Sequence, residues 1–178
     1  MRIASIVRDS IVDGPGLRFV VFVQGCSHNC LNCHNPQTHD PNGGYESSID
    51  EIIEQLKSDS LVEGVTLSGG DPFEQALACA KLAVEIKHYN PELTIWTYTG
   101  YTYEQLVSSG NYEWQLLLDL TDVLVDGPFI ESKKSYELKF RGSSNQRLID
   151  MQKTRLEGHV VEYTHHDNIL DKFQIPDS

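Results

Sequence analysis

Three of the four cysteines in this chain lie within one short segment, as Cys26, Cys30 and Cys33. A disulfide framework explains them poorly, because the fourth cysteine, Cys79, is far away in the sequence. Cys79 also falls at a core position of an expected helix, where a free cysteine acts as a small buried hydrophobe. The C-x3-C-x2-C spacing therefore indicates three metal ligands on one loop.

Two kinds of metal site fit this spacing. A [4Fe-4S] cluster usually takes four cysteines, so three local ones leave one iron open to another ligand, which indicates chemistry beyond electron transfer. The alternative is a structural zinc ion held by the same cysteines with His28 or His34 as the fourth ligand. Zinc sites usually pair two separated knuckles, which favours the cluster, but the spacing alone leaves both open.

Composition excludes several classes of function. The 178 residues include 14 Lys and Arg against 26 Asp and Glu, and the net charge of -12 makes nucleic acid an unexpected partner. No apolar run approaches the roughly 20 residues that cross a bilayer, and the N-terminus lacks the pattern of a secretory signal. We therefore expect no membrane partner and a cytoplasmic location.

Strand-like apolar runs alternate with helical patterns along most of the chain. The runs are residues 17–23, 64–67, 93–98, 122–125 and, more weakly, 147–151. This alternation predicts an α/β fold with a parallel sheet, in the form of a partial, open (β/α) barrel. Ligands are then expected beyond the carboxyl ends of the strands.

Helix starts are indicated by capping patterns. Ser48 and Glu51, and again Thr102 and Gln105, have the spacing of a capping box. A third helix is expected from about residue 72, where a proline suits the first helical position, to about residue 89. We expect a single domain over residues 1–178, with a peripheral C-terminal extension from about residue 152.

A glycine-rich turn follows the second predicted strand, as Ser68, Gly69, Gly70 and Asp71. Two glycines let the backbone approach a ligand closely, and Asp71 adds a carboxylate acceptor beside the start of a helix. Alone, such a segment is more often an ordinary strand-to-helix turn. Together with the cysteine loop, it suits a zwitterionic ligand, which carries a positive and a negative charge.

The cysteine spacing and the Gly-Gly-Asp turn together resemble the radical S-adenosylmethionine superfamily. The resemblance implies a barrel of the radical SAM type, a [4Fe-4S] cluster on Cys26, Cys30 and Cys33, and S-adenosyl-L-methionine chelated to the open iron. It also implies that the segment from Ser68 to Asp71 binds the amino group of that cofactor. The superfamily usually has an aromatic residue where this chain has Asn32, so backbone contacts from Asn32, Cys33 and His34 are expected to hold the adenine.

Further segments resemble the glycyl-radical activating enzymes of this superfamily. Asp13 to Arg18 matches their Asp-Gly-Pro-Gly-x-Arg element, and residues 96–101, 124–129 and 141–147 resemble the branch that serves anaerobic ribonucleotide reductases. These segments supply second candidates for the site: Arg18, Thr97, Tyr98, Asp126, Arg141 and Ser143. Each has an ordinary structural explanation as well, such as an ion pair between Arg18 and a nearby carboxylate.

The resemblance implies a defined activity and partners. Reductive cleavage of S-adenosylmethionine gives a 5′-deoxyadenosyl radical, which removes a hydrogen atom from a glycine of the reductase large subunit. No catalytic side chain is expected beyond the cluster and cofactor, and a reduced flavodoxin-type protein is the expected electron donor. The alternatives are an activase of another glycyl-radical enzyme, such as pyruvate formate-lyase, and a non-enzymatic zinc-binding module.

Overall fold

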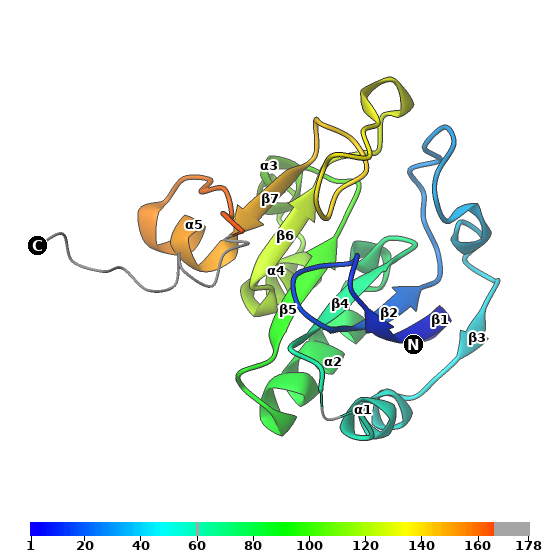
Figure 1. Ribbon diagram of the computed structural model, residues 1–178. Coiled ribbons are helices and arrows are strands. Elements are labelled where there is room, and N and C mark those ends of the chain that lie inside the picture. Colours follow the sequence, from blue (N-terminus) through cyan, green and yellow to red (C-terminus); the bar gives the residue numbers. More distant parts are fainter. Residues whose placement is uncertain (60, 166–178) are drawn as a thin grey trace, which may run out of the picture.

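The computed structural model describes residues 1–59 and 61–165 (Figure 1). In this part of the chain, seven strands form one sheet in the order β3-β1-β2-β4-β5-β6-β7. The strands are β1 (Arg2–Ser10), β2 (Arg18–Val23), β3 (Tyr45–Glu46), β4 (Gly64–Gly69), β5 (Thr94–Tyr98), β6 (Val123–Asp126) and β7 (Arg147–Asp150).

The described part of the chain also contains five α-helices and three short 3₁₀ helices. The α-helices are α1 (Ile49–Lys57), α2 (Ala76–Tyr89), α3 (Tyr103–Ser108), α4 (Tyr112–Leu120) and α5 (Met151–Glu157). The 3₁₀ helices are η1 (Pro36–Thr38), η2 (Pro72–Gln75) and η3 (Glu131–Lys133). The protein is thus a mixed α/β fold, as the alternation of patterns predicted.

The prediction of a parallel sheet is correct for the centre and wrong for the edges. Strands β2, β4, β5 and β6 are parallel neighbours, whereas β1, β3 and β7 join the sheet antiparallel. A parallel pair needs a long crossover, usually a helix. Only the short segment 11–17 links β1 to β2, and the segment 127–146 between β6 and β7 contains no α-helix, so both connections reverse the strand direction.

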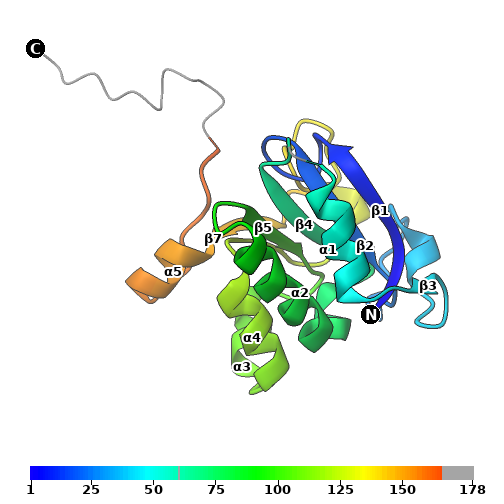
Figure 2. The same ribbon diagram turned by 90° about the horizontal axis from the view of Figure 1, so that it is seen from below.

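The two faces of the sheet are covered differently. Helices α1, α2 and α4 lie on one face (Figure 2), where their apolar residues pack in one core with alternate strand residues such as Val21, Leu67 and Ile95. On the opposite face a smaller cluster forms around Trp96, with Tyr163 packed against its ring. The alternation of side chains along each strand therefore separates a helix-covered face from a loop-covered face.

The predicted helix starts are confirmed, with one adjustment. Both capping boxes are present, at the starts of α1 and α3. The third helix ends at Tyr89 as expected, but its first turn, Pro72–Gln75, is the separate 3₁₀ helix η2. The side chain of Asp71 caps that turn by accepting from the backbone N–H of Phe73, and the α-helix proper begins at Ala76.

Part of the expected C-terminal extension is regular structure. Helix α5 buries Met151 and Thr154, and the Thr154 hydroxyl accepts a hydrogen bond from the backbone N–H of Val161. Residues 166–178, which belong to the same expected extension, lie outside the described residues. No helix in the described ranges is both long and apolar enough to cross a membrane.

Cys79 lies on α2 in the main core and is fully buried. Burial raises the pKa of its thiol to about 12, so the thiol stays protonated and unreactive. This placement confirms the expectation of a small core residue.

We expect Cys79→Ala to lower the free energy of unfolding by about 1 kcal/mol, because it removes one buried sulfur atom and leaves a small cavity. Urea unfolding of the metal-free protein measures this change. Cys79→Ser should cost more, since its hydroxyl is buried in an apolar core. A serine variant as stable as the wild type would contradict the described packing.

Candidate functional site

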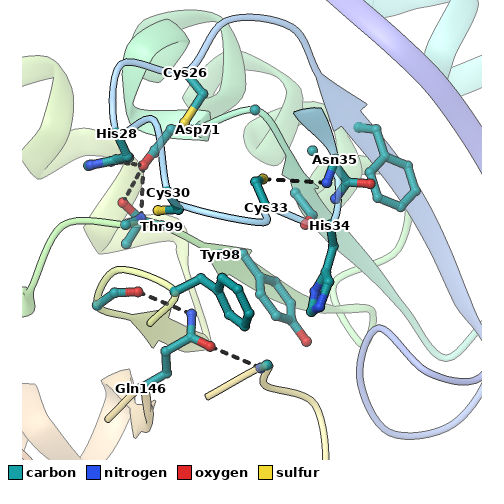
Figure 3. Close-up of a pocket in the computed structure, with 18 of the residues that line it drawn as sticks. Cys26, His28, Cys30, Cys33, His34, Asn35, Asp71, Tyr98, Thr99 and Gln146 are labelled. Atoms are coloured by element: carbon teal, nitrogen blue, oxygen red, sulfur yellow. Dashed lines mark hydrogen bonds and ion pairs between the residues drawn. The ribbon is translucent and has the colours of Figure 1, made fainter. Parts of the chain in front are cut away.

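The carboxyl ends of the parallel strands open onto a cavity of about 440 Å³, within the usual range for small-molecule sites. Its walls come from the ends of β2, β4 and β5 and the segments that follow them, from the segment 127–146 after β6, and from the segment 11–17 between β1 and β2. Figure 3 shows the cysteine loop on one side of this cavity, with Tyr98 and Gln146 across from it. The cavity therefore lies at the edge of the sheet where α/β proteins bind ligands.

The cysteine loop holds its shape through its own backbone. Asn29 and Asn32 have positive φ angles of 48° and 55°, a conformation that asparagine tolerates better than most residues. The backbone N–H of Cys33 donates to the carbonyl oxygen of Cys30 at 3.1 Å and closes the turn that contains Asn32. These turns bring Cys26, Cys30 and Cys33 to the wall of one cavity as free thiols.

The donor set fits an iron–sulfur cluster. Three free thiols line a cavity large enough for a ligand, and the backbone N–H of Asn35 lies 3.4 Å from Sγ of Cys33, a contact that suits a thiolate. Burial raises the pKa of the Cys26 thiol to about 11, so its deprotonation at neutral pH would depend on a bound metal.

The contacts of His28 weigh against one form of the zinc alternative. The ligands of a zinc ion must converge on one point, whereas the cysteines of a cubane bind different irons. His28 is also engaged elsewhere, because its Nε2 lies 2.7 Å from Oδ2 of Asp71.

Asp71 is almost fully buried, with 1% of its surface exposed, and protein donors surround its carboxylate. Oδ1 accepts from the backbone N–H of Phe73 at 2.9 Å. Oδ2 accepts from the Thr99 hydroxyl and the Gly100 backbone N–H, both at 2.9 Å, and faces Nε2 of His28. The dashed lines that meet Asp71 in Figure 3 mark the contacts of Oδ2. The carboxylate thus joins three segments that follow β2, β4 and β5.

His28 fits closely against the segment after β5. Its ring meets the Tyr101 ring edge-on, with centroids 4.4 Å apart. The hydrogen bond that His28 donates to Asp71 raises the pKa of His28 above its ordinary value, against the opposing effect of burial. A Cβ atom at Gly100 would lie 2.5 Å from the His28 ring, so only glycine leaves room for the ring at this position.

The Gly69–Gly70 turn is held to the end of β2 by its backbone. Gly70 N donates to Val23 O and Asp71 N donates to Gly25 O, both at 2.8 Å. Gly69 has a φ of +99°, which favours glycine, and a Cβ atom on Gly70 would lie 2.3 Å from the carbonyl oxygen of Gly25. Both glycines are therefore required by the fold itself, before any ligand is considered.

The structure places at the cavity most of the residues that were predicted to bind the cluster or S-adenosylmethionine. Its lining includes Cys26, Cys30, Cys33, His34, Ser68, Gly69, Gly70 and Asp71. Asn32 is exposed on the cysteine loop and is not among the lining residues. Of the second candidates, Tyr98 lines the cavity, and its hydroxyl donates to the Phe140 carbonyl oxygen at 2.9 Å.

Arg18 and Thr97 are buried away from the cavity. Arg18 begins β2, roughly 17 Å along the strand from Val23. Its guanidinium donates to the hydroxyls of Thr66 and Thr94 and to the carbonyl oxygens of residues 65 and 94, rather than pairing with a carboxylate as expected. Thr97 faces the helices, and its hydroxyl forms a hydrogen bond with the hydroxyl of Thr121 at the end of α4.

The other second candidates also have structural partners and do not line the cavity. Asp126 is buried, forms an ion pair with Arg147 and accepts from the backbone N–H at the start of α3. The Ser143 hydroxyl accepts from the backbone N–H of Ile130. Arg141 donates from Nη1 to the Gln146 carbonyl oxygen at 3.1 Å. Their direct contact with a cofactor stays a prediction.

Sequence reasoning missed several residues of the cavity wall. Thr99 and Gly100 directly follow β5, so the rule that strand ends meet at one edge could have identified them. Gln146 organises the segment after β6: its Oε1 accepts from the backbone N–H groups of Gly142 and Ser143, and its Nε2 donates to the carbonyl oxygen of Gly127. No sequence signal distinguishes this glutamine from other loop residues.

We expect Gly70→Ala to destabilise the protein by about 2 kcal/mol or more, because the added methyl group meets a backbone carbonyl that cannot move away. Gly110→Ala is the matched control: Gly110 has a φ of +68° but nothing within 4 Å of its added Cβ, so only backbone strain of about 1 kcal/mol is expected. Urea unfolding of both variants makes the comparison. Equal losses would contradict the described contact between the two loops.

This chain is similar to known proteins over most of its length. A family model described as a 4Fe-4S single cluster domain matches residues 12–149. The chain is 40% identical over 142 residues to an anaerobic ribonucleoside-triphosphate reductase-activating protein of Vibrio cholerae, covering 76% of this chain and 89% of the relative. The protein of the same name from Escherichia coli K12 is 39% identical over 142 residues, covering 76% and 90%.

A phage relative extends the comparison. The anaerobic ribonucleoside-triphosphate reductase-activating protein of enterobacteria phage T4 is 35% identical over 142 residues, which cover 77% of this chain and 86% of the relative. The matched family model supports the iron–sulfur interpretation of the cysteines over the zinc alternative. The chain belongs to the 4Fe-4S single cluster domain family and to the family of anaerobic ribonucleoside-triphosphate reductase-activating proteins.

Proposed function

We propose that this protein is a radical S-adenosylmethionine enzyme that activates an anaerobic ribonucleoside-triphosphate reductase by forming a glycyl radical on it. One observation supports this most strongly: three free cysteines and a glycine-rich turn line the same cavity in a chain of this family. The relatives are named as activating proteins of that reductase, which supports the reductase large subunit as the partner.

Each group of residues has a distinct task in this proposal. Cys26, Cys30 and Cys33 hold three irons of a [4Fe-4S] cluster and leave the fourth iron open. Backbone groups of the Ser68–Gly70 turn and of the Asn32–His34 segment hold S-adenosylmethionine. When bound, the reduced cluster and S-adenosylmethionine supply reductive cleavage of the sulfonium and removal of a hydrogen atom from a glycine of the reductase.

The chain's own residues orient and shield these groups. Tyr98 and Phe129 line the cavity with aromatic surface, which limits access of water to the reacting centre. Tyr98 stays a neutral phenol at ordinary pH, because burial raises its pKa. We infer that no side chain acts as a general acid or base.

We further propose that the sheet is a partial, open barrel of the radical SAM type, with its helices outside and the cavity at one end. The four central parallel strands and the one-sided helical layer support this view. The chain then works as one domain with a C-terminal extension, in the cytoplasm, with electrons from a reduced flavodoxin-type protein. The acidic net charge of -12 supports a protein rather than a nucleic acid as its partner.

The test of this function is radical formation on the partner. The anaerobically reconstituted protein is mixed with the reductase large subunit, S-adenosylmethionine and a reductant, and electron paramagnetic resonance spectra are recorded. We expect the doublet of a glycyl radical on the reductase and none on pyruvate formate-lyase. A radical on pyruvate formate-lyase alone would identify the other activase, and a colourless zinc protein after anaerobic purification would support the zinc-binding module.

Cys30→Ala should abolish the bound cluster, normally about four irons per chain, and with it reductive cleavage of S-adenosylmethionine. Iron analysis and chromatographic detection of 5′-deoxyadenosine measure the two effects. Cys79→Ala is the matched control, because this buried cysteine does not line the cavity and should retain both properties. Normal cleavage by Cys30→Ala would refute the ligand assignment.

A further inference from the structure

Both oxygens of the Asp71 carboxylate have protein partners. Its Oδ1 accepts one hydrogen bond, and its Oδ2 faces three donors, from His28, Thr99 and Gly100. A carboxylate oxygen has about two lone-pair directions, so Oδ2 has no free position for an additional amino group. An ion pair between Oδ2 and a bound ligand would require one of these donors to leave, and Oδ1, which has one donor, lies in a carboxylate that is 1% exposed.

His28 is the donor that links Asp71 to the cysteine loop. It stands between Cys26 and Cys30 in the sequence, and its side chain is 16% exposed. The Tyr101 ring packs against it on one side, and the absence of a side chain at Gly100 makes room for it. The ring therefore has one defined position, which ties the cysteine loop to the turn after β4.

We propose that the His28–Asp71 hydrogen bond is a positioning device, through which Asp71 fixes the cysteine loop over the Gly69–Gly70 turn. This inference rests on the proposed function, because the two elements so aligned are those that hold the cluster and S-adenosylmethionine. Asp71 then assists cofactor binding through His28, and the amino group of the cofactor binds to backbone carbonyl oxygens of the turn. His28 acts as a positioning residue and not as an iron ligand.

The alignment matters because the cofactor would contact two parts of the site, the open iron and the Gly69–Gly70 turn, and these parts follow different strands. The open iron is fixed by the loop after β2, whereas the turn follows β4. A small shift of one against the other would weaken simultaneous binding to both, as loss of outer hydrogen bonds does at metal sites in general. The backbone N–H of Asp71 donates to Gly25 O before the first cysteine, and the Ser27 hydroxyl donates to Oε1 of Glu74. His28 adds a contact with a buried carboxylate midway between Cys26 and Cys30.

The test compares three histidine variants of the full chain after anaerobic reconstitution. His28→Ala removes the donor, His28→Gln retains an amide N–H at nearly the position of Nε2, and His39→Ala is the matched control. His39 lies further along the same loop, and its Nε2 has no hydrogen-bond partner. Iron content, the affinity for S-adenosylmethionine, and the change that this cofactor causes in the spectrum of the reduced cluster are measured.

We expect His28→Ala to keep its iron but to bind S-adenosylmethionine at least about tenfold more weakly, with a smaller spectral change. His28→Gln should restore most of the affinity, and His39→Ala should match the wild type. Wild-type affinity in His28→Ala, or failure of the glutamine to restore binding, would overturn the proposal.

A double-mutant cycle with Asp71→Asn separates positioning from direct binding. If Asp71 acts through His28, the double variant should bind S-adenosylmethionine no more weakly than the worse single variant. Additive losses in the two single variants would show that Asp71 does not act on cofactor binding through His28 and would overturn the proposal.

Hydrogen exchange of the metal-free protein distinguishes this inference from the proposed function. His28→Ala should increase amide exchange at residues 26–34 and at Gly100, and His28→Gln should reverse that increase. Unchanged exchange would overturn the positioning role. A wild-type protein that binds iron but no S-adenosylmethionine would refute the proposed function, while these exchange rates would still decide whether His28 fixes the loop.

Discussion

The site depends on one buried carboxylate, that of Asp71, whose hydrogen-bond partners come from three segments of the protein. A buried negative charge is costly unless several donors satisfy it. Asp71 meets this requirement with donors from its own helix start, from the segment after β5, and from His28 on the cysteine loop. Since each donor comes from a segment that lines the cavity, satisfying the carboxylate also assembles the cavity.

The parts of the fold that govern this assembly were predictable from local sequence. Parallel strands place their carboxyl ends at one edge, so the cysteine loop after β2 and the Gly-Gly turn after β4 had to meet there. Cys79 was correctly expected in the core, because its helical spacing places it among apolar residues. Local patterns are informative when an element's own residues decide its structure.

Other features depend on partners that are distant in the sequence. Thr97 and Tyr98 are adjacent in β5 and therefore face opposite sides of the sheet, so only one of them could line the cavity. Which one does so depends on where the helices pack. Asp126 forms an ion pair with Arg147, and Arg18 donates hydrogen bonds to the hydroxyls of Thr66 and Thr94. No sequence motif predicts these contacts. The antiparallel edges likewise follow from connections without crossover helices.

We propose that the cysteine loop and the Gly-Gly turn together hold one cofactor at an open iron. Electron–nuclear double resonance can test this on the reduced, reconstituted protein, with S-adenosylmethionine labelled by ¹⁵N at its amino group. We expect a resolved coupling between that nitrogen and the cluster, because the amino group would bind the open iron beside the turn. The absence of any coupling, with the cofactor bound and the cluster intact, would contradict it.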